Sequence, residues 1–326
     1  MILSVFNKKP LPQAVVFLGP HALLNDYLAK FYASQAQFKD CDLQTIDCQE
    51  DGLGALLAAL TESSLFSAQK LLIIKNPFFL TSKVPATEKK NVKELQTIFE
   101  HLQELTDALV FVADYEKLDQ RKKLTKLLKQ GAEIVDLRVK PYQTGDLLGE
   151  LAKLEGYSFE PGAFKLLLER SDQVLETALG NYNTLKAITA GKTISKQTVS
   201  EHIDLSLAQN VFAILEDDLH HNYQAALHRL DDQLRQGQSP VGLLAVFASQ
   251  LELLVTVKTL AQRGRSPEQI TQDLGIHPYR VKLALRNRSA LSQLKHMLLE
   301  AIELDYGYKT GRYTSALFLQ NFLLRQ

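Results

Sequence analysis

Residues 14–137 alternate five short apolar segments with stretches of helical periodicity, and this alternation restricts the fold more than any other feature of the sequence. The apolar segments are rich in Val, Ile and Leu almost throughout, which is typical of parallel strands covered on both faces. Strands and helices in this rhythm predict a three-layer α/β sandwich. The expected strands are Ala14–Gly19, Leu43–Asp47, Lys70–Lys75, Leu109–Asp114 and Glu133–Leu137.

The stretches between these segments predict helices. The last one has Asp119 as a candidate N-cap and Gly131 at the position where a helix commonly stops. The expected helices are His21–Gln37, Leu53–Glu62, Asn91–Leu105 and Asp119–Gln130.

Beyond residue 140 the pattern predicts helices only. Short helices fill residues 141–205, a stretch too small for an independent core. Apolar residues at three- and four-residue spacing continue from residue 206 to the end and predict a helical bundle. We therefore expect three domains, at residues 1–140, 141–205 and 206–326.

The composition is that of an ordinary globular protein. Lys plus Arg and Asp plus Glu both number 37, so the formal charge is zero, which excludes a whole-molecule attraction to nucleic acid or acidic membranes. The apolar run Val241–Leu251 is shorter than the roughly 20 residues of a membrane helix. Without a signal-peptide pattern, and with only Cys41 and Cys48, the sequence predicts a cytoplasmic protein that does not contact membranes.

The residues that follow the first expected strand show whether the chain carries a nucleotide-binding motif. A P-loop would follow it with GxxxxGK[ST], in which backbone N–H groups and a lysine hold the phosphates. Here Gly19, Pro20 and His21 begin a loop that lacks the second glycine, the lysine and the hydroxyl residue, and Pro20 removes an N–H donor. The third strand ends at Lys75, whereas a P-loop enzyme has an acidic residue there that organises Mg²⁺. We expect a degenerate phosphate loop without nucleotide binding.

Other catalytic patterns are missing from the sequence. It contains no HExxH, GxSxG or GxGxxG motif, and neither cysteine has a nearby base in the sequence. We therefore predict no catalytic residues, no metal site and no cofactor. The remaining candidates are interpreted as solvated helix-face residues: His220, His221, His228, Asp217, Asp218, Asp231 and Asp232.

Three groups of segments follow one another along the chain in a recognisable order. They are Ser64–Ser67 followed by Gln69–Asn76, Leu109–Ala113 followed by Lys117–Asp119 and Arg121–Leu124, and Ser266–Ile270 followed by Leu274–Val281. Together these segments extend over essentially the whole chain, and in this order they resemble the delta subunit of the bacterial DNA polymerase III clamp loader.

The resemblance implies an AAA+-like domain without a working ATP site, a small helical lid and a C-terminal helical collar for oligomerisation. It also implies partners: the beta sliding clamp, the tau/gamma and delta prime subunits of a hetero-pentamer, and primer-template DNA. Such a chain helps to open the clamp for loading onto primed DNA, as a non-hydrolysing part of the polymerase III holoenzyme.

The clamp contact is expected at Ser64, Leu65 and Phe66. Two large apolar side chains stand among serines between an expected helix and an expected strand, where they are available to a partner's pocket. The alternative from the residues alone is that Leu65 and Phe66 cap the α/β core. The resemblance favours the clamp contact.

A local positive charge in residues 258–288 supports contact with DNA. This stretch contains seven basic residues and only two acidic ones, Glu268 and Asp273. Residues 266–288 also resemble a helix-turn-helix. One alternative function is therefore sequence-specific DNA binding, although Leu274, Ile276 and Val281 favour packing within the bundle. Another is a divergent ATPase such as the loader's motor subunit, which the degenerate loop argues against. The candidates for DNA contact are Arg280, Lys282, Arg286, Arg288 and, for stacking on a base, Tyr306.

Overall fold

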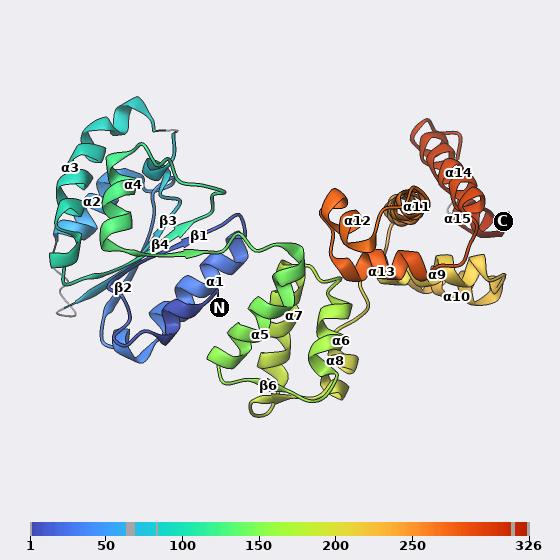
Figure 1. Ribbon diagram of the computed structural model, residues 1–326, viewed down its shortest axis with the longest axis horizontal. Helices are drawn as coiled ribbons and strands as arrows, with labels where there is room; N and C mark the ends of the chain where they lie inside the picture. Colours follow the sequence, from blue (N-terminus) through green and yellow to red (C-terminus); the bar gives the residue numbers. More distant parts are fainter. Residues whose placement is uncertain (1, 63–68, 83, 314–316, 325–326) are drawn as a thin grey trace. The chain divides into compact units, whose positions relative to one another are not determined.

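The computed structural model describes residues 2–62, 69–82, 84–313 and 317–324. The chain divides into two compact units, Met1–Tyr157 and Ser158–Gln326, and each has its own hydrophobic core (Figure 1). The expected three-domain division at residues 140 and 205 stays a prediction.

The first unit contains a five-stranded, fully parallel sheet in the order β2-β3-β4-β1-β5. On β1, Val16 lies between Phe111 of β4 and Ile134 of β5. The five expected strands are confirmed, each within one residue at either end. Their bounds are β1 Ala14–Leu18, β2 Asp42–Asp47, β3 Lys70–Lys75, β4 Ala108–Ala113 and β5 Glu133–Asp136.

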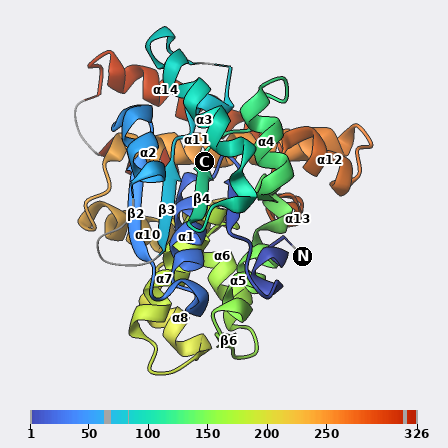
Figure 2. The ribbon, with the colours of Figure 1, turned by 90° about the vertical axis from the view of Figure 1, so that its left-hand side faces the viewer.

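Helices cover both faces of this sheet (Figures 1 and 2). Alternate strand residues such as Val16, Leu72 and Phe111 join one core cluster with α2, α3 and α4. The opposite face meets α1, where the ring of Phe17 lies 6.1 Å from that of Tyr32. The three-layer sandwich is confirmed. The helices are α1 Ala22–Ala33, α2 Gly52–Thr61, α3 Lys89–Glu100, α4 Lys123–Gly131 and α5 Thr144–Leu154.

The expected N-cap at Asp119 is wrong. Helix α4 begins four residues later, at Lys123. The Asp119 carboxylate instead accepts hydrogen bonds from the backbone N–H and the guanidinium of Arg121, at 3.1 and 3.0 Å. Asp side chains that bond a nearby backbone N–H compete with helix formation, which explains the later start.

The second unit begins with three helices and a small sheet. The sequence predicts no strand in residues 141–205, but Ser158–Phe159 (β6) and Thr193–Ile194 (β7) pair in parallel. Two residues are too few to produce a periodic pattern, so these strands leave no signal in the sequence. The helices are α6 Ala163–Arg170, α7 Leu175–Ile188 and α8 Lys196–His202.

A helical bundle built around α11 follows. This 23-residue helix reaches a mean hydropathy of 1.8 and is long and apolar enough to cross a membrane. Within the unit its buried residues, among them Phe247 and Leu254, pack in one cluster with α9, α13 and α14, as the core helix of a bundle does. The helices are α9 Leu207–Leu219, α10 Tyr223–Arg235, α11 Pro240–Gln262, α12 Pro267–Leu274, α13 Pro278–Arg286, α14 Leu291–Lys309 and α15 Leu317–Leu324.

Candidate functional site

The loop after β1 is tied down by the chain's own side chains. Asn25 of α1 is fully buried, and its amide donates to the carbonyl oxygen of Gly19 at 2.8 Å and to a carboxylate oxygen of Asp114 at 2.6 Å. A Cβ added at Gly19 would lie 2.7 Å from the carbonyl carbon and oxygen of Leu137. Gly19 is therefore required for close packing against the chain after β5.

Asp26, the residue after Asn25, carries a negative charge at the position where a P-loop has its Ser or Thr hydroxyl. Asp26 forms ion pairs with Lys75 at the end of β3 and, at 2.7 Å, with Lys30 of its own helix. Burial acts to raise the pKa of Asp26, but the hydrogen bonds and charges of Lys30 and Lys75 outweigh it and hold the pKa below its usual value. Lys75 is thus paired with Asp26. It occupies the end of β3, where an enzyme that hydrolyses nucleotides would need an acidic residue for Mg²⁺.

Among the described residues, no group of three or more His, Cys, Asp or Glu side chains could hold a metal ion. His220, His221 and His228 are exposed, as expected. Both thiols are free, and burial is the largest cause that raises the pKa of each, to about 12 for Cys48. Neither thiol has the low pKa of a nucleophilic cysteine.

The residues expected to contact the clamp, Ser64, Leu65 and Phe66, lie outside the described residues. Their surroundings are described: α2 ends at Thr61 and β3 begins at Lys70. Lys70 is 4% exposed and forms an ion pair with Asp107 at 3.3 Å. The segment 63–68 therefore connects two elements that belong to the core of the first unit.

The basic residues expected to contact DNA fall into two groups. Lys282 and Arg286 lie one helical turn apart on α13, Arg288 follows the helix, and all three are exposed. The opposite face of α13 is buried through Val281 and Ala284. The helix-turn-helix is thus packed into the bundle on one side, as Val281 suggested, and presents cations on the other.

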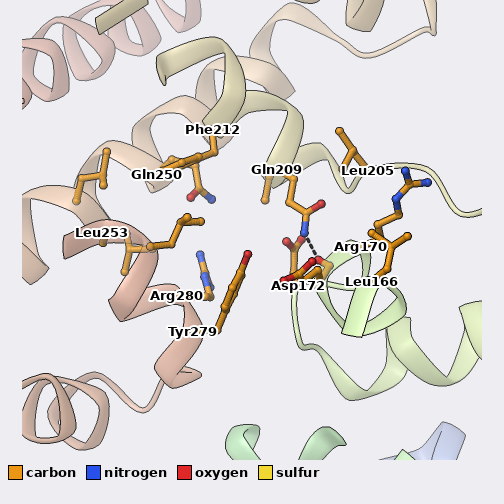
Figure 3. Close-up of a pocket in the computed structure, with 15 residues that line it drawn as sticks. Leu166, Arg170, Asp172, Leu205, Gln209, Phe212, Gln250, Leu253, Tyr279 and Arg280 are labelled. Carbon is orange, nitrogen blue, oxygen red and sulfur yellow. Dashed lines mark hydrogen bonds between the residues drawn. The ribbon is translucent and has the colours of Figure 1, made fainter. Parts of the chain in front are cut away.

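Arg280 lies apart from these three residues, at a cavity of about 240 Å³ within the second unit. Figure 3 shows it beside Tyr279 and facing the amide of Gln250. On the other side of the cavity, the amide of Gln209 donates to the backbone carbonyl of Glu169. Contact between Arg280 and DNA stays a prediction, as it does for the other basic residues.

An exposed apolar stripe on α14 is a feature that the sequence reasoning missed. Leu299, Ile302 and Tyr306 recur at three- and four-residue spacing and are 61%, 53% and 64% exposed. The exposure of Tyr306 shows that this side chain is not packed inside the bundle. The sequence does contain the pattern that indicates this stripe: it forms a second apolar row on the helix, beside the buried row through Leu294 and Met297. Exposed apolar stripes of this kind mark interaction surfaces.

Comparison with known proteins identifies the family. The model of the DNA polymerase III delta subunit matches residues 29–138, and the model of its C-terminal domain matches residues 208–326. DNA polymerase III subunit delta of Bacillus subtilis is 30% identical over 88% of this chain and 84% of its own length. This chain belongs to the delta-subunit family of DNA polymerase III.

Two further relatives agree with this assignment. The probable DNA polymerase III subunit delta of Aquifex aeolicus is 22% identical over 98% of this chain and 93% of its own length. The solved structure of the Bacillus subtilis DNA clamp loader delta protein (YqeN) matches 100% of this chain and 99% of its own, at 28% identity and a TM-score of 0.66. The AAA+-like fold class with a helical C-terminal part is confirmed.

The residues matched to the delta family include the segment 63–68 and its flanks, α13 and the stripe on α14. They also include Asp218 of α9, which was interpreted as solvated and is fully buried. Within the described part of the chain, neither carboxylate oxygen of Asp218 has a hydrogen-bond partner. Burial raises the pKa of Asp218 to about 7.

Proposed function

We propose that this delta subunit, whose role is in clamp loading, binds the DNA sliding clamp through Leu65 and Phe66, with Ser64 beside them, and helps to open the ring. The observation that carries the proposal is the place of this Leu-Phe pair: it lies in the family-matched region, between α2 and β3. Residues of both flanking elements belong to the core of the first unit. A titration of clamp binding by a Leu65→Ala/Phe66→Ala variant tests it.

Ring opening then follows from differential binding. A subunit that binds the opened clamp interface more tightly than the closed one shifts the clamp toward the open state. Burial of each apolar side chain contributes about 1.5–3 kcal/mol, which is enough for the pair to act as an anchor. No bond is made or broken by this subunit, which acts as a non-hydrolysing part of the polymerase III holoenzyme in the cytoplasm.

The β1–α1 loop supports a subunit that does not bind ATP. Asn25 stands at the position of the P-loop lysine and is already bonded to Gly19, while Asp26 brings a negative charge next to the place of the phosphates. We expect no saturable binding in a titration of the purified protein with ATP and Mg²⁺ up to millimolar concentrations. Saturation at micromolar ATP would contradict the proposal and favour an ATPase of the same fold.

The stripe of Leu299, Ile302 and Tyr306 supports assembly through the helical collar with the tau/gamma and delta prime subunits. We expect Ile302→Glu to reduce recovery of the assembled loader in co-purification at least tenfold, because a buried unpaired carboxylate costs several kcal/mol. Gln272→Glu adds the same charge at an exposed site on α12 and is expected to assemble normally. Equal recovery of both variants would contradict this use of the stripe.

Primer-template DNA is the proposed partner of Lys282, Arg286, Arg288 and, within the complex, Arg280 and Tyr306. Exposed cations without base-reading partners support a sequence-independent contact with phosphates. Tyr306 stands on the stripe of α14, so base stacking and assembly are alternative uses of this side chain. The family assignment accounts for the chain without sequence-specific DNA binding by residues 266–288.

A further inference from the structure

Lys70 is a buried lysine whose three ammonium donors meet three oxygen atoms. The Nζ atom donates to the carbonyl oxygens of Ala59 and Glu62, and it lies 3.3 Å from a carboxylate oxygen of Asp107. A lysine ammonium has three N–H donors and no acceptor, so this set of partners satisfies it completely. The side chain is 5% exposed, and lysine is rarely buried to this degree unless it is paired.

The alternation of β3 explains why this side chain reaches α2. Leu72 and Ile74, two and four residues further on, point into the core that α2 covers, and Lys70 shares their face. Ala59 lies in the last turn of α2 and Glu62 is its C-cap. The ammonium therefore lies at the negative end of the helix dipole, against carbonyl groups that have no partner within the helix.

The contacts of Lys70 hold both ends of the segment that carries Leu65 and Phe66. Glu62 is the last described residue before the segment, and its carbonyl oxygen is bonded to Lys70. Gln69 is the first described residue after it; its side-chain amide donates to the carbonyl oxygen of Thr106, and its own carbonyl oxygen accepts from the N–H of Asp42 at 2.9 Å. The two ends of segment 63–68 are thus joined through one side chain.

Stability alone does not explain a charge at this place. A buried ion pair is often no more stabilising than apolar side chains of similar volume, and the next four residues of β3, Leu71 to Ile74, are apolar. What the ammonium provides, and a methionine would not, is a fixed distance between the end of α2 and the start of β3. Fixing the ends of a binding segment before association reduces the ordering that binding requires.

We propose that Lys70 is a positioning residue for clamp binding: by joining Ala59, Glu62 and Asp107, it fixes the ends of segment 63–68 so that Leu65 and Phe66 are presented to the clamp. The inference rests on the proposed clamp contact at Leu65 and Phe66. It adds a residue that does not touch the partner and acts through the backbone on both sides of the contact.

The test is a clamp-binding titration of the full chain carrying Lys70→Met together with Asp107→Asn, which removes both charges of the ion pair and leaves neither unpaired. We expect a folded protein whose Kd for the clamp is raised by roughly tenfold, the size of a lost preorganisation. Leu28→Ala is the matched control: it opens a cavity on the opposite face of the same sheet and is expected to lower the melting temperature while leaving the Kd unchanged.

Three outcomes separate the two proposals. If Leu65→Ala/Phe66→Ala binds the clamp like the wild type, the contact itself is wrong, and the inference about Lys70 fails with it. If that variant loses binding while folded Lys70→Met/Asp107→Asn keeps the wild-type Kd, only the inference is overturned. Should the double variant not fold, the titration is repeated with Lys70→Met alone, which removes the donors to Ala59 and Glu62, and a folded Lys70→Met protein with wild-type affinity would overturn the inference equally.

Discussion

Replacement of both Leu65 and Phe66 by alanine is expected to weaken binding of the sliding clamp at least about 100-fold, while the protein remains folded. The two side chains together contribute roughly 3–6 kcal/mol if both are buried in the clamp, and each 1.4 kcal/mol corresponds to a tenfold change in Kd. The measurement is a fluorescence or calorimetric titration of the labelled clamp, with circular dichroism as the check on folding.

A matched control separates this contact from a general loss of apolar surface. Leu23 and Leu43 are also exposed leucines of the first unit, at 47% and 58%, and lie outside segment 63–68. Leu23→Ala with Leu43→Ala is expected to bind the clamp like the wild type. Equal losses in the two double variants would mean that the apolar surface of this unit, and not the Leu-Phe pair, carries the affinity.

The second large effect is expected at Asp218. Its pKa is about 7 in the folded protein, against an ordinary value of 3.8, because burial disfavours the charged form. Between about pH 4 and pH 7 the unfolded chain releases this proton and the folded chain keeps it, so the free energy of unfolding falls as the pH rises and is level above pH 7. Three pKa units correspond to a loss on the order of 4 kcal/mol.

Asp218→Asn is therefore expected to raise the free energy of unfolding at pH 8, on the order of 2–4 kcal/mol, and to leave it nearly unchanged at pH 4. Asp217→Asn is the adjacent control. Asp217 is paired with Arg229 at 2.8 Å, so its loss is expected to be neutral or mildly destabilising at pH 8. Urea unfolding at the two pH values measures both variants. A pH-independent effect of Asp218→Asn would show that the buried carboxylate is not the cause.

Asp218 also shows where inference from the sequence reached its limit. Two adjacent aspartates in a polar stretch are typical of a solvated surface, and that interpretation is wrong for Asp218. The residue follows Val211, Ile214 and Leu215 by seven, four and three positions, so the helix period places it in the same buried row. The helical periodicity indicates that Asp218 is buried, but aspartate is mostly exposed in proteins, and the interpretation followed that general tendency.

The parallel sheet could be predicted because its strands are buried on both faces and are therefore continuous apolar runs. β6 and β7 could not be, because two residues carry no periodicity. Of the candidate sites, the Leu-Phe pair came from a resemblance, since an apolar dipeptide in a loop is chemically unspecific. The role proposed for Lys70 depends on the structure, because nothing in the sequence indicates that its ammonium meets carbonyl groups eleven and eight residues earlier.

The stripe on α14 illustrates a different limit. Apolar residues at three- and four-residue spacing predict a helix, but they do not say which of two apolar rows is buried. Leu294 and Met297 face the core, while Leu299 and Ile302 face outward. Only the packing of α14 against α11 separates the buried row from the exposed one.

We propose that this delta subunit opens the clamp by binding energy alone. The most direct measurement follows a fluorescent reporter placed across the clamp's own subunit interface while the purified protein is added in the absence of nucleotide. We expect a saturable opening signal that ATP does not alter and that Leu65→Ala/Phe66→Ala removes. Opening that requires ATP hydrolysis by this chain, or a full signal from the alanine variant, would contradict it.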